Sequence, residues 1–161
     1  MTRLYGRSQG GERCVDYAPG GHWKTFTMLA AIRASGVVRQ ASLLGEGAMN
    51  GPLFLQWIKT RLCPTLSPGD VVVMDNLSSH KVTGVEKAIE AVGASLWYLP
   101  AYSPDLNPIE KMWSKIKAWL RRTTAGSFEE LEVAVGAALD AVTPNECVNY
   151  LRSCGYTQRE R

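Results

Sequence analysis

Hydrophobic and polar residues follow two periods along the chain, and each period predicts one kind of element. Short runs of apolar and β-branched residues predict strands. Apolar residues that recur every three or four positions predict helices. The strands are expected at 24–32, 37–44, 71–74 and 95–99. The helices are expected at 50–62, 79–92, 107–122 and 127–142.

Residues with strong local preferences mark several boundaries of these elements. Ser35-Gly36 supplies a turn between the first two strands, which predicts a hairpin. Gly93 stands where a helix C-cap favours a left-handed glycine. Asn107-Pro108 places a capping side chain and a first-turn proline at the start of the third helix. Ser127, followed three residues later by Glu130, predicts a capping box for the last helix.

The order of these elements predicts one α/β domain. Helices that lie between strands from residue 53 onward imply parallel crossovers, so we expect a mixed sheet with helices on both faces. A chain of 161 residues fits a single domain. We expect 1–22 to be a loop segment, 23–143 to be the domain and 144–161 to be a C-terminal tail.

Composition excludes several classes of protein. Hydrophobic residues make up 45% and charged residues 20%, which indicates a globular chain rather than a disordered one. No apolar run is long enough to span a membrane, and the first residues lack the apolar core of a signal peptide. Four cysteines without a C-x-x-C pair, and two histidines, disfavour a zinc site or a disulfide framework. We therefore expect a cytoplasmic protein.

Positive charge is concentrated on the third helix. The net charge is +3. Between 106 and 122 the only acid is Glu110, whereas five residues are cationic: Lys111, Lys115, Lys117, Arg121 and Arg122. Such a helix could bind a polyanion, or it could present a solvated face.

Two carboxylates stand where catalytic groups gather in α/β folds. Asp75 follows the buried strand 71–74, at the end where ligands bind in open sheets; the alternative is that it caps the turn with Asn76. Glu110 lies in the first turn of the basic helix, where the alternative is a capping box with Asn107. The segment between the two carboxylates contains a helix and a strand, which could return Glu110 beside Asp75. Convergent carboxylates can bind two Mg²⁺ ions about 3.5–4 Å apart and clamp a phosphodiester.

Two segments of the sequence resemble motifs of a known family. Residues 73–81, Val-Met-Asp-Asn-Leu-Ser-Ser-His-Lys, resemble the second-aspartate motif of DDE transposases from bacterial insertion sequences related to mariner. Residues 99–113, Leu-Pro-Ala-Tyr-Ser-Pro-Asp-Leu-Asn-Pro-Ile-Glu-Lys-Met-Trp, resemble the block around their glutamate. The similarity runs from about Gly20 to Val142. It implies a ribonuclease H-like fold, catalytic and metal-binding Asp75 and Glu110, a Mg²⁺ or Mn²⁺ cofactor, and DNA as the partner.

The resemblance also suggests roles for residues around the two acids. Asn76 and His80 match motif positions and are expected to support the site; their alternative is turn and helix-start chemistry. Tyr102, in the loop before the basic helix, is a candidate DNA contact together with the five cations. Trp113 could stack on DNA, but it lies on the apolar stripe and is more simply a core residue. Trp97 is also expected in the core.

The first acid of the family pattern is missing from its expected place. The family carries it on an opening strand, which the resemblance places in the centre of the sheet, between the hairpin and 71–74. Asp16 is the only aspartate before the hairpin, and its surroundings are not an apolar strand end. We therefore expect an incomplete domain without its first, central strand, with exposed strand edges, poor stability and very weak DNA cleavage.

Three functions remain open at this point. The first is the catalytic domain of a DNA transposase, either inactive or one half of a split gene that is complemented by its upstream half, and oligomeric because transposition pairs two ends. The second is a non-catalytic DNA-binding fragment that modulates a full-length transposase. The third is a ribonuclease H-like nuclease for RNA–DNA hybrids, which the block 102–113 disfavours. Each would act on nucleic acid, so the protein is expected in a bacterial cytoplasm, at the nucleoid when bound to DNA.

Overall fold

The computed structural model describes residues 10, 12, 15, 24–123 and 125–156. Strand β1 (Phe26–Leu29) pairs antiparallel with β4 (Leu43–Glu46), and β2 (Ile32–Arg33) pairs antiparallel with β3 (Gly36–Val37). The predicted hairpin is confirmed, but its ladder is divided, since a 3₁₀ turn, η2 (Arg39–Ala41), separates β3 from β4.

The third pair of strands is parallel. Strand β5 (Val71–Met74) pairs with β6 (Ser95–Tyr98) through a connection that contains a 3₁₀ turn, η5 (Ser78–His80), and helix α2 (Val85–Glu90). Both strand orientations occur, as expected of a mixed sheet. However, the described strands form three separate two-stranded sheets rather than one continuous sheet. Trp97 is 62% exposed, so its expected place in the core is wrong.

The first helix begins at a side-chain cap. The Asn50 carboxamide oxygen accepts a hydrogen bond from the Leu53 amide (3.0 Å), and helix α1 (Gly51–Trp57) follows. It continues as a π-helical segment, η3 (Ile58–Leu62), and ends in a 3₁₀ turn, η4 (Cys63–Thr65), which contains Pro64. The expected helix is therefore confirmed in extent but not in regularity.

Three helices complete the chain. They are α3 (Pro108–Leu120), α4 (Phe128–Asp140) and α5 (Pro144–Ser153). The expected C-terminal tail is therefore wrong for α5. Thr143 and Glu146 form a reciprocal capping box and Pro144 occupies the first turn, so this segment carries its own helix-start signals.

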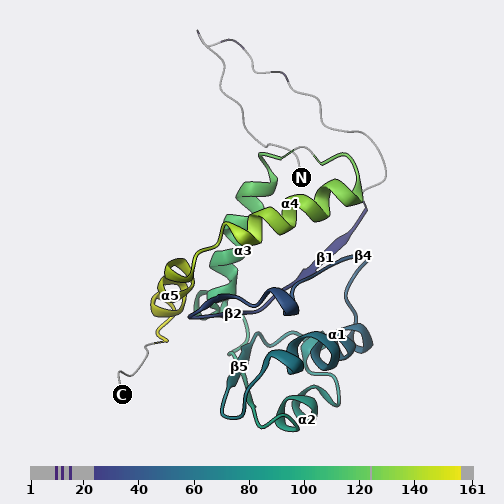
Figure 1. The fold of residues 1–161 in the computed structure, drawn as a ribbon, viewed down its shortest axis with the longest axis vertical. Coiled ribbons are helices and arrows are strands. Elements are labelled where there is room, and N and C mark those ends of the chain that lie inside the picture. The colour runs from purple at the N-terminus through teal and green to yellow at the C-terminus, as the bar shows by residue number, and fades with distance from the viewer. Residues whose placement is uncertain (1–9, 11, 13–14, 16–23, 124, 157–161) are drawn as a thin grey trace.

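Helices cover both faces of the β1–β4 pair. In Figure 1, α3 and α4 lie on one side of these strands, whereas α1 and α2 lie on the other. Burial agrees, because Met28 packs with the core formed by α3, α4 and α5, while Leu29 packs with the core of α1 and α2. The alternation of side chains along a strand explains why one short strand serves two cores. Helices on both faces are thus confirmed for this part of the fold.

Candidate active site

Asp75 is the first residue after β5 and lies at the carboxyl end of that strand. Its Oδ1 accepts a long hydrogen bond from the Leu77 amide (3.4 Å) and lies 2.5 Å from Nδ1 of His80. The bond to Leu77 is the turn contact that the alternative interpretation expected. Both contacts use Oδ1, and Asp75 Oδ2 makes no hydrogen bond within the described part of the chain. The side chain is 37% exposed, so this oxygen can reach a ligand.

His80 is fixed by three neighbours. Its ring stacks on Phe54 with centroids 4.1 Å apart, and its carbonyl accepts a hydrogen bond from the Tyr98 hydroxyl (2.8 Å). The contact of its Nδ1 with Asp75 is short but lacks the angles of a hydrogen bond, so it is an ion pair only when the imidazole is protonated. The His80 ring, packed on Phe54, therefore lies directly against the Asp75 carboxylate.

Glu110 occupies the first turn of α3, and the structure contradicts its role in a capping box. The Asn107 amide, which a capping glutamate would bind, donates instead to the Pro104 carbonyl (3.1 Å). The Asn107 side chain is buried and forms no cap hydrogen bond. The half-buried Glu110 carboxylate forms no hydrogen bond or ion pair with any residue that the structure describes, so it is free to bind a ligand.

One cavity joins these groups. Asp75, His80 and Glu110 all line a cavity of about 670 Å³ between the segment 27–33 and β5, closed on a further side by the start of α3. The structure therefore brings the two expected catalytic acids to the wall of the same cavity, although the sequence separates them by more than 30 positions. Asn76 is half-buried and is not part of this wall, so it does not join the other three.

The donor chemistry suits a hard divalent cation, but the set of ligands is incomplete. Carboxylate oxygens are the donors that Mg²⁺ and Mn²⁺ prefer. Among the residues that the structure describes, no group of three His, Cys, Asp or Glu side chains could hold a metal ion. Asp16, the only aspartate before the hairpin, lies outside the described residues. Within the described residues, the cavity wall thus carries the two carboxylates of Asp75 and Glu110.

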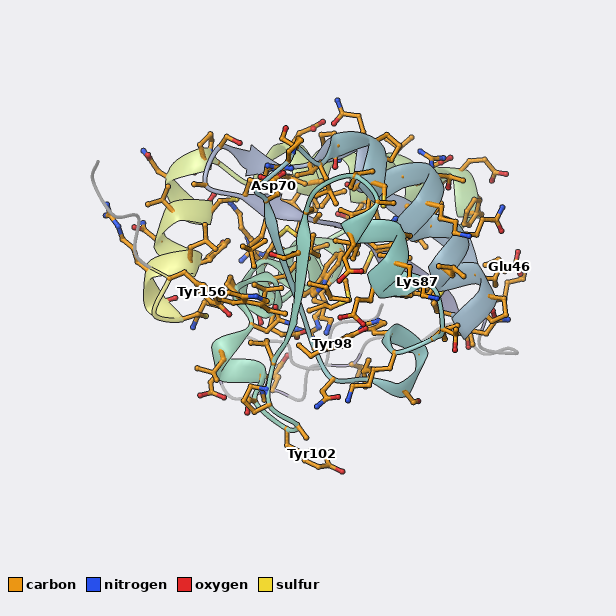
Figure 2. The ribbon with its side chains drawn as sticks, turned by 90° about the horizontal axis from the view of Figure 1, so that it is seen from below. Glu46, Asp70, Lys87, Tyr98, Tyr102 and Tyr156 are labelled. Carbon is orange, nitrogen blue, oxygen red and sulfur yellow. The ribbon has the colours of Figure 1, made fainter. Side chains whose placement is uncertain are left out.

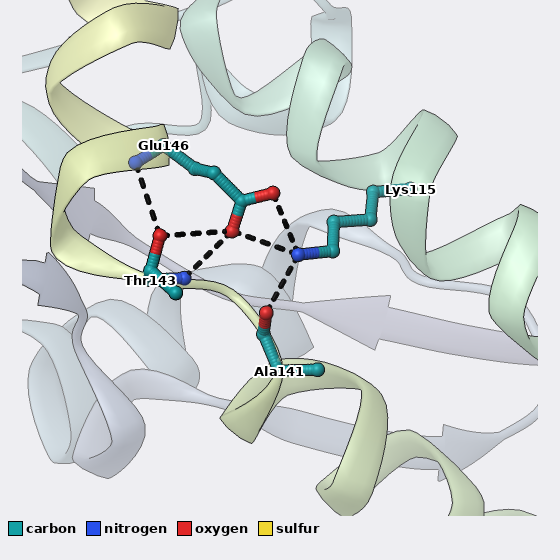
Figure 3. A network of polar contacts seen from close by, with 4 residues as sticks. All are labelled: Lys115, Ala141, Thr143 and Glu146. Carbon is teal, nitrogen blue, oxygen red and sulfur yellow. Dashed lines mark hydrogen bonds and ion pairs between the residues drawn. The ribbon is translucent and has the colours of Figure 1, made fainter.

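Lys115, one of the five expected phosphate contacts, is engaged within the protein. Its Nζ donates to both Glu146 carboxylate oxygens (2.6 and 2.7 Å) and to the Ala141 carbonyl (2.6 Å), as Figure 3 shows. Lys115 therefore ties α3 to α5 and to the end of α4. The other four cations of this region are exposed: Lys111, Lys117, Arg121 and Arg122.

Aromatic residues near the site divide between core and surface. Tyr102 is fully exposed, and Figure 2 shows it at the tip of its loop, pointing away from the body of the molecule. Its φ of +58° places a non-glycine residue in the left-handed region, which costs backbone energy. Trp113 packs against the core of α3 and α4, as expected, whereas Trp119 is 40% exposed.

Sequence reasoning missed several residues that build the site. Phe54 lies within the expected helix 50–62, and nothing in the sequence indicates that it stacks on His80. The ion pairs Arg33–Asp70 and Lys115–Glu146 join residues far apart in sequence, so no local pattern announces them. The capping box of α5 could have been found, because Thr143 and Glu146 have the required spacing.

None of the described helices is long and apolar enough to cross a membrane. A comparison with curated proteins found no match. Among solved structures, the Mos1 strand transfer complex matches with a TM-score of 0.75 at 18% identity, covering 96% of this chain and 47% of the Mos1 chain. The catalytic domain of Mos1 mariner transposase matches with a TM-score of 0.67 at 15% identity, covering 81% of this chain and 74% of the other.

The chain thus spans about half the length of the Mos1 transposase in its complexes, and it has the fold of the Mos1 catalytic domain. The expected ribonuclease H-like architecture fits this likeness. The model of one family, described as DDE superfamily endonuclease, matches residues 1–132. The match covers most of the sequence, and the protein belongs to the DDE superfamily endonucleases.

Proposed function

We propose that this chain is part of the catalytic domain of a DNA transposase, which cleaves transposon ends and joins them to target DNA. The observation behind this proposal is that Asp75 and Glu110 line the same cavity. Membership of the family supports it. The matched Mos1 structures, which include a strand transfer complex and a paired-end complex with Mn, support a DNA substrate. The proposal of a bacterial protein that works at the nucleoid rests on the resemblance of residues 73–81 and 99–113 to transposases of bacterial insertion sequences.

Asp75 and Glu110 serve as two of the metal-binding catalytic carboxylates. A divalent cation such as Mg²⁺ or Mn²⁺ would supply Lewis acidity and charge neutralisation at the phosphodiester. Asp75 offers Oδ2, while the His80 ring holds its other oxygen. Glu110 offers a carboxylate without a competing partner, at the N-terminus of α3. Asn76 acts as a turn residue beside the site.

Within the described residues the site has two carboxylates, so we expect the chain alone to cleave DNA very weakly. Two carboxylates supply less negative charge than a two-metal site needs. The missing ligand belongs to the central strand implied by the family resemblance, which a complementing upstream half would provide. Robust nicking of transposon-end DNA by the isolated chain with Mg²⁺ or Mn²⁺ would refute this part of the proposal.

Direct measurement of Mn²⁺ binding tests the two carboxylates without requiring activity. Electron paramagnetic resonance titrations would compare the wild-type chain with Asp75→Asn and Glu110→Gln, and with Glu90→Gln as the control. Glu90 is an exposed carboxylate on α2 that is not part of the cavity wall. We expect each site variant to weaken Mn²⁺ binding about tenfold or more, and the control to leave it unchanged. Equal Mn²⁺ binding in all four proteins would contradict the assignment.

A non-catalytic DNA-binding role that modulates a full-length transposase is the second candidate. The observation that favours it is the set of exposed cations on and after α3: Lys111, Lys117, Arg121 and Arg122. Binding through phosphate contacts falls steeply as salt concentration rises, and it needs no metal. A gel-shift titration in EDTA would therefore detect it, and an affinity independent of salt would exclude it. In this role Tyr102 adds an exposed aromatic contact.

A further inference from the structure

Asn107 differs from every other buried residue in the described part of the chain. It is 8% exposed, and no other described residue of polar or charged type is buried. Its N–H donates to the Pro104 carbonyl (3.1 Å), and its carbonyl accepts from the Glu110 amide (3.2 Å). Its carboxamide, in contrast, has no hydrogen-bond partner among the described residues. A buried amide group without a partner is unfavourable and is therefore rare in native proteins.

Asn50 shows what an asparagine at the start of a helix ordinarily does. Both asparagines are N-cap residues, and each is followed by a proline in the first helical turn. The Asn50 carboxamide is exposed and accepts a hydrogen bond from the Leu53 amide (3.0 Å). Asn107 makes no such bond, so helix capping does not explain its buried carboxamide. An unpaired buried polar group in a cavity wall indicates a ligand that completes its hydrogen bonds.

The surroundings of this carboxamide favour an anion. Residues 107–110 all line the cavity that contains Asp75, so the N-terminus of α3 borders that cavity. The Ile109 N–H belongs to the first turn and makes no hydrogen bond within the described residues. The dipole of this 13-residue helix adds partial positive charge at the same end. Two free donors, the Ile109 N–H and the Asn107 Nδ2, are therefore available where the helix attracts negative charge.

The backbone that carries these donors is held in place on its N-terminal side. The Tyr156 hydroxyl donates to the Leu106 carbonyl (3.1 Å), and the Pro104 carbonyl binds the Asn107 N–H. Tyr156 also lines the cavity. Donors that are in position before a ligand arrives can bind negative charge without reorganisation of the protein.

We infer that the Asn107 carboxamide and the Ile109 N–H bind a phosphodiester oxygen of the DNA strand in this cavity. Asn107 Nδ2 donates one hydrogen bond and the Ile109 amide donates another, as in phosphate sites at other helix N-termini. Glu110 lies three residues after Asn107, on the same face of α3, so the bound phosphate lies beside the proposed metal-binding carboxylate. Asn107 thus contacts the substrate and is neither a helix cap nor a metal ligand.

This inference deepens the proposed function and rests on it for the identity of the strand. Its test uses a phosphodiester without metal and without DNA cleavage, so the two can fail separately. Unchanged Mn²⁺ binding in the Asp75 and Glu110 variants would remove the proposed metal site but leave the phosphate contacts standing.

Nuclear magnetic resonance of the intact, ¹⁵N-labelled chain tests the phosphate contacts. The probe is dimethyl phosphate, which carries the single negative charge of a phosphodiester, added in EDTA; sodium chloride at equal ionic strength is the control. We expect dimethyl phosphate to shift the Asn107 side-chain and Ile109 backbone signals saturably, and chloride to leave both unchanged. Asn107→Leu should weaken binding at Ile109 about tenfold, because it removes a hydrogen bond to a charged group. Glu110→Gln should tighten binding about threefold or more, because it removes a neighbouring negative charge.

Thermal unfolding separates a binding role of Asn107 from a structural one. Asn107→Leu replaces an unpaired buried amide by an apolar side chain, so the midpoint of unfolding should stay the same or rise. Asn50→Leu is the matched control, since it removes a cap that is formed. It should lower the midpoint by about 2–4 °C and leave dimethyl phosphate binding unchanged. Asn107→Ala replaces the leucine variant if that variant does not fold.

Mn²⁺ titrations followed by electron paramagnetic resonance separate a phosphate contact from a metal ligand. A carboxamide that donates to phosphate through Nδ2 contributes nothing to a cation bound in the absence of DNA. We therefore expect Asn107→Leu to bind Mn²⁺ as tightly as the wild-type chain.

Four outcomes would overturn the inference. The first is that dimethyl phosphate shifts neither the Asn107 nor the Ile109 signal, in the wild-type chain and in Glu110→Gln. The second is equal binding of dimethyl phosphate by Asn107→Leu. The third is a loss of Mn²⁺ affinity in Asn107→Leu as large as in Asp75→Asn, which would assign the carboxamide oxygen to the cation. The fourth is a fall of the unfolding midpoint in Asn107→Leu as large as in Asn50→Leu, which would indicate a structural role.

Discussion

The Arg33 guanidinium donates two hydrogen bonds to the Asp70 carboxylate, at 3.2 and 2.7 Å, although the two residues are 37 positions apart in the chain. The same guanidinium donates to the Thr65 carbonyl at 2.7 Å. This contact joins β2, the end of η4 and the start of β5. In the described structure it links two sheets that share no ladder hydrogen bond, at one end of the cavity that holds Asp75 and Glu110.

Loss of this ion pair should destabilise the fold in a pH-dependent way. Arg33, and then the Ser67 amide, lower the pKa of Asp70 below its usual range. A carboxyl group with a lowered folded-state pKa stabilises the fold above its unfolded pKa of about 3.9, and this stabilisation is lost as pH falls through the folded pKa. Arg33→Gln should therefore lower the free energy of unfolding by about 1 kcal/mol at pH 7, an estimate reduced for partial exposure, and much less at low pH.

Urea unfolding at a series of pH values would measure this difference. Arg39→Gln is the control, because its ion pair with Asp140 is more exposed (44% and 68%). We expect that control to change stability by less than about 0.5 kcal/mol. An equal loss in both variants at every pH would contradict the special role of Arg33.

Lys115 should matter for stability. Its ammonium group holds Glu146 and the Ala141 carbonyl, and it lowers the pKa of the Glu146 carboxyl group. Lys115→Met should lower the free energy of unfolding by about 1–2 kcal/mol, because Glu146 and the end of α4 lose their cationic partner. Lys117→Met, two positions along the same helix, should change it by less than about 0.5 kcal/mol. Thermal unfolding followed by circular dichroism would separate the two.

DNA binding should depend on Lys117 more than on Lys115, which is the reverse of their effects on stability. Lys117 is exposed and free to approach a phosphate, whereas Lys115 is held by three oxygens. Lys117→Ala should reduce the slope of log affinity against log salt by about 1. Lys115→Gln should leave that slope unchanged at temperatures where the variant remains folded. A larger loss of slope in Lys115→Gln would show that the network opens when DNA binds.

Gly93 should be less tolerant of substitution than another left-handed glycine. Its φ is +79°, which confirms the predicted C-cap, and an added Cβ would lie 3.2 Å from the Pro68 Cα. Gly155 has a φ of +87° with nothing within 4 Å of its added Cβ. Both alanine substitutions should lower the free energy of unfolding by about 1 kcal/mol through backbone strain. Gly93→Ala should lower it by about 1–3 kcal/mol more, because the added Cβ overpacks against Pro68. Denaturant unfolding of the two variants would measure the difference, and equal losses would contradict the close approach.

Local sequence patterns determined much of this protein. Val71–Met74 reads as a strand because its apolar run has no polar break, although Val71 is 46% exposed in the structure, and Asp75 is expected at its end by the geometry of α/β sheets. The helices α1, α3 and α4 follow from apolar spacing and from residues such as Asn50 and Ser127 at their starts. The pattern of α5 was equally readable, through Thr143 and Glu146, although we expected a tail there.

Tertiary structure decided which of these residues act together. The spacing of charges on α3 could not distinguish Lys115 from Lys117, because the partner Glu146 lies on another helix. The sequence left a capping role open for Glu110, whereas in the structure the Asn107 amide donates to the Pro104 carbonyl instead. Trp97 has an apolar neighbourhood in sequence, but in β6 it lines the open cavity and is 62% exposed. Local patterns encode periodicity and caps, whereas long-range contacts depend on how the elements pack, which no single segment contains.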